Sequence, residues 1–145
     1  MPNAISISIP GPPVPKARAR IGKGHAYTPE RTATAEIDIG YAMQQARTAA
    51  GQDILQGPLA VNIVFIFKPP ISWPKKRKIA ALGTPHTQKP DLDNLVKILD
   101  SGNAVLWNDD AQIWRISATK EWGVEARTEI VVQPLVFSGM TVSRL

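Results

Sequence analysis

Aspartates are concentrated in two short segments of this chain, within twenty residues of one another. The first reads Lys-Pro-Asp-Leu-Asp-Asn-Leu-Val-Lys from Lys89 to Lys97, and the second reads Trp-Asn-Asp-Asp-Ala-Gln from Trp107 to Gln112. Carboxylates from two segments that meet in space could hold a hard cation, and Mg²⁺ usually needs one or two of them plus a substrate phosphate. Such a cation, with an ammonium nearby, suits phosphodiester hydrolysis. The two segments and the stretch between them contain Asp91, Asp93, Asp100, Asp109 and Asp110.

Simpler roles for the same aspartates stay open on spacing alone. Asp91 is in the position of a helix N-cap, a common place for an aspartate. Asp93 and Lys97 have the spacing of a solvated i,i+4 pair. The adjacent Asp109 and Asp110 could form a turn before a strand. A zinc site is disfavoured, because the chain has no cysteine and its two histidines lie in unrelated segments.

The charge of the chain is unevenly distributed. The net charge is +5, but residues 1–88 carry +7 and residues 89–145 carry −2. A basic half attached to an acidic half is typical of a phosphate-binding protein with a carboxylate metal site. Charges clustered by chance on solvated faces would give the same pattern, so charge alone does not decide between these explanations.

The most periodic segments predict the elements that must position these residues. Alternation predicts a strand over 5–9 and a central strand, covered on both faces, over 59–67. A helix is predicted from Thr28-Pro29 to about Ala50, with Gly51 as its C-cap. Apolar spacing predicts a second helix from Asp91 to about Asn103. Its polar row, flanking the apolar stripe, consists of Asp93, Lys97 and Asp100.

The other segments complete the predicted fold. Residues 16–29 are basic and without periodicity, which predicts a loop. Residues 75–82 begin as a solvated basic loop and end as a short helical segment. Strands are predicted over 112–122 and 129–133, joined as a hairpin by a turn around Gly123. The order of these elements predicts an α+β fold, a small mixed β-sheet with packed helices.

The composition is typical of one globular domain. The chain has 145 residues, 43% hydrophobic and 20% charged, and we expect a single domain over 1–145 with a loosely ordered tail from about 136. No apolar run reaches the ~18–20 residues needed to span a bilayer, and the first residues lack the pattern of a signal peptide. The absence of cysteine excludes disulfides and thiolate chemistry, which suits a cytoplasmic protein.

Both acidic segments closely resemble motifs of the RusA family of Holliday-junction resolvases. The run Ile-Pro-Gly-Pro-Pro-Val-Pro-Lys-Ala-Arg from Ile9 to Arg18 and the Tyr-Thr-Pro element at 27–29 are also similar to that family, so the resemblance follows nearly the whole chain. It implies a Mg²⁺ cofactor, with Mn²⁺ able to substitute. The residues it implies are Asp91, Asp93 and Asp110 for metal binding and catalysis, Asp109 as a neighbouring metal contact, and Lys97 for catalysis.

The resemblance also implies a function. Members act as homodimers on four-way DNA junctions in recombination and repair, make paired symmetric nicks, and are often encoded by phages and prophages. A two-fold symmetric dimer matches the approximate two-fold symmetry of a junction. No membrane and no small-molecule cofactor are implied. The chain departs from the family pattern in the run at 100–104, and its segment at 71–88 is longer than in the best-known members.

A resolvase must also grip DNA without reading much sequence. Each phosphate that it neutralises makes binding more dependent on salt. Trp73, beside the basic run, could act as a wedge in DNA, whereas Trp107, Trp114 and Trp122 are expected in core or dimer packing. The basic residues expected to contact DNA are Lys16, Arg18, Arg20, Lys23, Lys75, Lys76, Arg77, Lys78 and Lys89.

The sequence leaves two other functions open. The chain could be a non-catalytic protein that binds junctions, with aspartates that only cap helices and interact with water. It could also be a nuclease that prefers flaps or other branched DNA.

Overall fold

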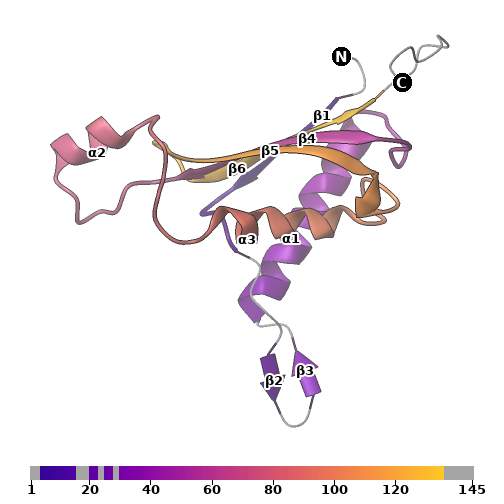
Figure 1. Ribbon diagram of the computed structural model, residues 1–145, viewed down its shortest axis with the longest axis horizontal. Coiled ribbons are helices and arrows are strands. Elements are labelled where there is room, and N and C mark those ends of the chain that lie inside the picture. Colours follow the sequence, from indigo (N-terminus) through magenta and orange to yellow (C-terminus); the bar gives the residue numbers. More distant parts are fainter. Residues whose placement is uncertain (1–3, 16–19, 23–24, 28–29, 136–145) are drawn as a thin grey trace.

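The structure is a computed structural model that describes residues 4–15, 20–22, 25–27 and 30–135, with side chains for 4–15 and 38–135 (Figure 1). The tail at 136–145 and the residues Lys16, Arg18, Lys23, Thr28 and Pro29 lie outside the described residues. The strands are β1 (Ile5–Pro10), β2 (Arg20–Gly22), β3 (His25–Tyr27), β4 (Leu59–Phe67), β5 (Ile113–Trp122) and β6 (Arg127–Pro134). The helices are α1 (Glu30–Ala49), α2 (Lys75–Ala81) and α3 (Leu92–Val96), with 3₁₀ turns η1 (Lys97–Gly102) and η2 (Asp110–Gln112).

Four of these strands form one mixed sheet in the order β1-β6-β4-β5. β6 pairs antiparallel with β1 and with β4, while β4 and β5 are parallel. Parallel strands need a long connection between them, and α2, α3 and both 3₁₀ turns lie in that connection. The predicted α+β class with a small mixed sheet is confirmed, as is the interior position of β4.

The predicted hairpin of β5 and β6 is wrong, because these two strands lie on opposite sides of β4. The chain between them must pass over the end of β4. Gly123 makes this crossing possible: its N–H donates to the carbonyl of Phe67 at 2.9 Å, and a Cβ on it would come within 2.4 Å of Ile66. The chain therefore does turn at Gly123, but the turn connects strands that are not neighbours.

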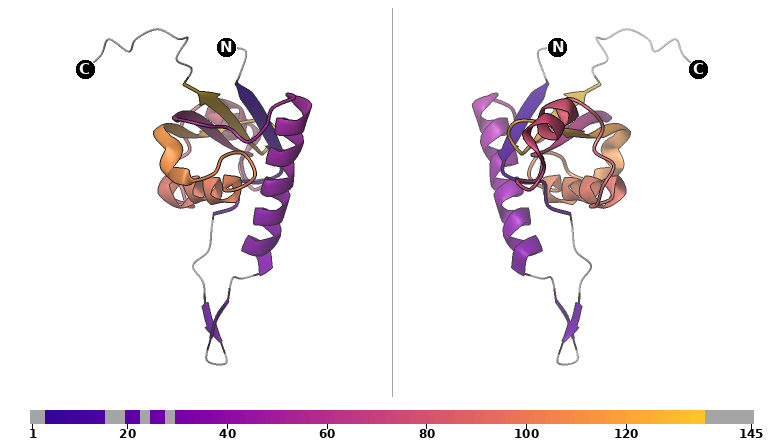
Figure 2. Two further views of the ribbon diagram at one scale, coloured as in Figure 1. Left: turned by 90° about the vertical axis from the view of Figure 1, so that its right-hand side faces the viewer. Right: turned by 90° about the vertical axis from the view of Figure 1, so that its left-hand side faces the viewer.

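Helices α1 and α3 lie on the same face of this sheet, and α2 lies beyond one end of it (Figures 1 and 2). The alternate residues Leu59, Val61 and Ile63 of β4 are buried on that face, whereas Asn62 on the other face is exposed. On that second face Ile66 is buried and Val64 is half-buried, so the prediction that both faces of β4 are covered is confirmed near the end of the strand and wrong at Asn62. The remaining core comes from β1, β6, α1, α3, η1 and the loop after it, with Ile5, Ile7, Ile39, Met43, Leu95, Ile98, Leu99, Leu106, Trp107, Ile130 and Val132 among the buried residues.

Two basic segments expected as loops contain regular structure. Within residues 16–29, β2 and β3 pair antiparallel and lie apart from the four-stranded sheet (Figure 1). The basic run at 75–78 belongs to helix α2, which follows Pro74. Helical periodicity is hidden there because α2 has no buried residue to mark its inner face. In the described part of the chain, no helix is both long and apolar enough to cross a membrane.

Helix α1 ends as its sequence predicts. Gly51 has a φ of 66°, a left-handed conformation that costs glycine little. Its N–H donates to Thr48 at 3.0 Å, and the N–H of Gln52 donates to Arg47 at 3.1 Å. This pair of bonds satisfies the last carbonyls of the helix in a Schellman motif.

The second predicted helix begins as expected but tightens into a 3₁₀ helix after Val96. Gly102 closes it and lies against the buried Trp107, where a Cβ would be 2.4–2.8 Å from three ring atoms. The carbonyl of Gly102 also accepts from the N–H groups of Val105 and Leu106, at 3.1 and 2.9 Å. Only glycine therefore allows the tryptophan to close this turn.

Gly102→Ala should lower the free energy of unfolding by about 1–3 kcal/mol, because the new methyl group overpacks the core against Trp107. Gly40→Ala in α1 is the matched control, since the nearest atom to its added Cβ is 3.9 Å away and alanine favours a helix. Urea unfolding followed by circular dichroism measures both. Equal stability of the two variants would contradict the packing argument.

Candidate functional site

The first acidic segment begins α3 and leaves its carboxylates in solvent. Asp91 is the N-cap residue, and its carbonyl accepts from the N–H of Leu95 at 3.2 Å. Its side chain makes no capping bond. The carboxylate instead accepts a hydrogen bond from Nζ of Lys89 at 2.7 Å and stays 58% exposed. The interpretation of Asp91 as a side-chain cap is therefore wrong.

Charge around Asp91 favours its ionised form. The hydrogen bond and the charge of Lys89 lower the pKa of Asp91 below its ordinary value, burial opposes this shift, and the charge of Lys120 adds a smaller effect in the lowering direction. The stabilisation from this pair is present above the ordinary pKa of an aspartate and is lost as the pH falls through the lowered one. Because both groups face solvent, its main consequence is a carboxylate that stays charged in mild acid.

The same helix separates the apolar stripe from the polar row. Asp93 and Lys97 are exposed, one helical turn apart, whereas Leu95 and Leu99 are buried in the core. Burial of that stripe fixes the orientation of α3 and η1, so the ammonium and the two carboxylates of the first segment are held at the surface.

The second acidic segment makes structural contacts. Asp109 caps η2 by accepting from the N–H of Ala111 at 2.9 Å, and Gln112 completes a capping box. Asp110 accepts from Nε1 of the buried Trp107 at 2.8 Å and from Nδ2 of Asn103 at 3.1 Å. Both aspartates therefore stabilise the turn that leads into β5.

The two acidic segments lie at opposite ends of β5. Lys120 of β5 donates to the carbonyl of Pro90, next to Asp91, whereas Asp110 begins the 3₁₀ turn η2, which directly precedes Ile113, the first residue of the strand. These two positions of β5 are separated by about 23 Å along an extended strand. One chain therefore does not bring the carboxylates of both segments together. Among residues with described side chains, no three His, Cys, Asp or Glu groups are arranged to hold a metal ion.

Comparison with known proteins assigns the family. The sequence model described as Endodeoxyribonuclease RusA matches residues 10–133, most of the chain and both acidic segments. The chain belongs to the RusA family. It is also 28% identical over 142 residues to "Uncharacterized protein YqaN" of Bacillus subtilis (strain 168), an alignment that covers 90% of this chain and 96% of that protein. The RusA family is a family of endodeoxyribonucleases, so membership supports nuclease activity on DNA.

The basic helix of this RusA-family nuclease is attached to the sheet by aromatic rings. The guanidinium of Arg77 lies 3.7 Å from the centre of the Trp73 ring, and Trp73 packs against Trp122 at 5.0 Å between centroids. Trp73 is half-buried in these contacts, so it anchors α2, which disfavours its use as a wedge. Lys75 and Lys76 remain exposed.

The other expected DNA contacts are only partly described. Lys89 is exposed beside Asp91. Arg20 lies in β2, but its side chain is outside the described part, as are Lys16, Arg18 and Lys23. Of the remaining tryptophans, Trp107 and Trp122 are buried as predicted, whereas Trp114 is 57% exposed on β5 and is not in the core.

His86 gives no signal in the sequence, yet it lies at the centre of the aromatic contacts. Its ring stacks on Phe67 at 4.0 Å and packs against Trp122 at 4.4 Å. Its Nδ1 has no hydrogen-bond partner in the described part of the chain. Burial and the charge of Lys120 lower the pKa of His86, which favours the neutral ring. The neutral imidazole packs between the aromatic rings of Phe67 and Trp122.

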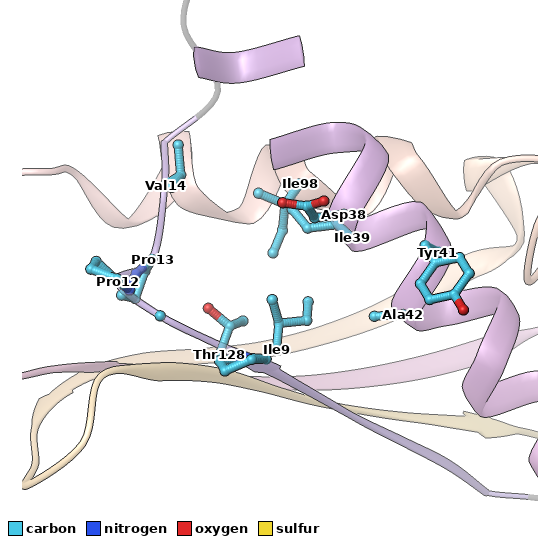
Figure 3. A pocket seen from close by; sticks show the side chains of 12 residues that line it. Ile9, Pro12, Pro13, Val14, Asp38, Ile39, Tyr41, Ala42, Ile98 and Thr128 are labelled. Atoms are coloured by element: carbon cyan, nitrogen blue, oxygen red, sulfur yellow. The ribbon is translucent and has the colours of Figure 1, made fainter. Parts of the chain in front are cut away.

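A pocket of about 470 Å³ lies between the end of β1 and α1 (Figure 3). Ile9 and Thr128 project from the sheet toward Ile39 and Ile98 there. Among its described lining residues, Asp38 is the one charged side chain. A single carboxylate in apolar surroundings does not make a metal site, so the pocket is not the candidate site.

Asp110→Ala should lower the free energy of unfolding by about 1–3 kcal/mol, because it leaves the indole N–H of the buried Trp107 without an acceptor. Asp53→Ala, at an exposed position after α1, is the control and should leave stability unchanged. Thermal or urea unfolding without added metal measures this effect. Wild-type stability of Asp110→Ala would mean that the bond to Trp107 contributes nothing.

Proposed function

We propose that this chain is a Mg²⁺-dependent endodeoxyribonuclease that resolves four-way DNA junctions, as a homodimer, by paired symmetric phosphodiester cuts. The observation that carries the proposal is the first acidic segment. It lies within the RusA match, and its Asp91, Asp93 and Lys97 are exposed from the start of α3 to the start of η1. The bond from Lys89 to Asp91 lies at the surface.

The donor set of this segment fits Mg²⁺. Asp91 and Asp93 offer hard carboxylate oxygens, and Mg²⁺ needs one or two of these plus a substrate phosphate. When bound, the ion would activate water and polarise the scissile phosphate. Lys97 places an ammonium one turn beyond Asp93, where it can stabilise negative charge that develops on the phosphate.

Asp110 and its neighbour Asp109 are part of the proposed ligand set through the family resemblance. Within one chain they are at the far end of β5 from Asp91. For Asp110 to share an ion with Asp91, the homodimer must bring opposite ends of β5 from two protomers together. The proposal therefore links complete metal binding to dimer formation.

The proposed DNA contacts include basic side chains that precede the first acidic segment in the chain. Lys89 is adjacent to Asp91, and α2 carries Lys75, Lys76 and Lys78 earlier in the same connection between β4 and β5. Binding of DNA phosphates by these side chains would direct the DNA strand toward the carboxylates of Asp91 and Asp93. The positions of Lys16, Arg18, Arg20 and Lys23 as further contacts are part of the same proposal.

A junction-binding protein without catalysis is the second candidate. The structural use of Asp109 and Asp110, together with the separation of the two acidic segments, favours it over a nuclease for flaps or other branched DNA. It predicts binding of four-way DNA with no dependence of strand cleavage on metal.

Asp93→Asn should abolish cleavage of a labelled immobile four-way junction in Mg²⁺ while leaving junction affinity within about two-fold, because the side chain is exposed and only its charge is removed. Asp53→Asn is the matched control and should cut at the wild-type rate. Cleavage is mapped on all four strands, with chelator and Mn²⁺ arms, alongside gel-shift binding.

Wild-type cutting by Asp93→Asn would refute the site assignment. Absence of any metal-dependent nick by the wild-type protein would favour the binding protein. Faster cutting of a flap than of the junction would assign a different branched substrate.

Replacing Lys75, Lys76 and Lys78 together by Gln should weaken junction binding and reduce the slope of log Kd against log salt, by about 0.9 for each phosphate that is no longer neutralised. Arg77 is retained, since it packs on Trp73. Arg115→Gln, on the exposed part of β5, is the control. An unchanged slope would exclude α2 from the DNA interface.

A further inference from the structure

Lys120 of β5 holds the backbone on both sides of Lys89. Its ammonium donates to the carbonyl of Gln88 at 2.7 Å and to that of Pro90 at 2.8 Å. The three residues that it brackets lead directly into Asp91, the N-cap of α3. Two charge-assisted bonds from one side chain therefore set where the first acidic segment starts.

The backbone of β5 extends this attachment upstream. The carbonyl of Lys120 accepts from the N–H of His86 at 2.9 Å, and Trp122 exchanges bonds with Gly83 and Thr84 at 2.8 and 3.0 Å. The chain from 83 to 86 thus runs along the outer edge of β5. The ammonium of Lys120 extends this contact to Pro90. β5 therefore holds the segment before Asp91 at its start, residues 83–86, and at its end, residues 88–90.

Lys120 also differs from Lys89 in its relation to Asp91. Lys89 bonds the carboxylate itself and is 84% exposed. Lys120 is half-buried and uses its protons on backbone carbonyls. Because these hydrogen bonds go to the backbone, Lys120 does not occupy the carboxylate oxygens of Asp91.

We propose that Lys120 is a positioning residue for the nuclease reaction, acting through the carbonyls of Gln88 and Pro90 to hold Asp91 in place beside Asp93. This inference rests on the proposed function, in which these two aspartates bind the metal. Groups that orient metal ligands from outside the ligand shell commonly change metal affinity or activity by 10–100-fold when removed.

The test compares Lys120→Met, which keeps the length of the side chain and loses its donors, with Lys120→Arg, whose guanidinium can bond both carbonyls. Lys68→Met, at an exposed position after β4, is the control. Mn²⁺ alone is titrated into ¹⁵N-labelled protein, and broadening of the amide signals of residues 91–93 is followed. Single-turnover junction cleavage is measured against Mg²⁺ concentration, with junction affinity measured separately.

Lys120→Met should raise the Mn²⁺ concentration for half-broadening, and the Mg²⁺ concentration for half-maximal cleavage, by about ten-fold or more. Junction affinity should change less than three-fold. Lys120→Arg should recover most of the loss, and Lys68→Met should match the wild type. If Lys120→Met does not fold, Lys120→Gln takes its place, because its neutral amide is one bond shorter and does not supply the two charge-assisted bonds.

Wild-type metal titrations for folded Lys120→Met or Lys120→Gln would overturn the positioning role while leaving the proposed function intact. The positioning role would also be overturned if Lys120→Met weakened metal binding and junction binding by the same factor and Lys120→Arg restored neither. No broadening at residues 91–93 in the wild-type protein would refute the proposed function and this inference together.

Discussion

The parallel pairing of β4 with β5 determines where every candidate residue lies. A chain that leaves β4 at Phe67 must return to the opposite end of the sheet before β5 can begin. α3 and η1 make that return, running along the buried face with Leu95 and Leu99 in the core. The first acidic segment therefore starts at one end of β5 and the second finishes at the other, so their separation follows from the topology.

Much of the fold could be predicted because its signals are local. The alternation in β1 and β4, the apolar stripe of α3 and the glycine at the end of α1 each depend on residues within a few positions. Strand order is different, because β5 and β6 are neighbours in sequence and would form a hairpin by default. Nothing local shows that Gly123 takes the chain over Ile66 and Phe67.

The sequence was sufficient to predict which residues belong to the candidate site. It was not sufficient to predict how those residues are arranged in space. The motif around Asp91 and Asp93 is specific, and exposure of both side chains agrees with a role outside the core. By contrast, Asp110 is bonded to Trp107, a contact set by a tightly packed turn around Gly102. Lys120 meets Pro90 across thirty residues, and a contact of that range leaves no periodic trace in a single sequence.

The aromatic attachment of α2 links the basic helix to the end of the sheet. Trp73 covers Trp122, and His86 covers Phe67. The segment from 71 to 88 thus shields the rings of Phe67 and Trp122 from solvent, and it also contributes the basic residues of α2. A relative with a shorter segment here must also change the residues equivalent to Phe67 and Trp122, or it would leave two aromatic side chains in water. Deletion of the segment and replacement of those rings are therefore expected to occur together in evolution.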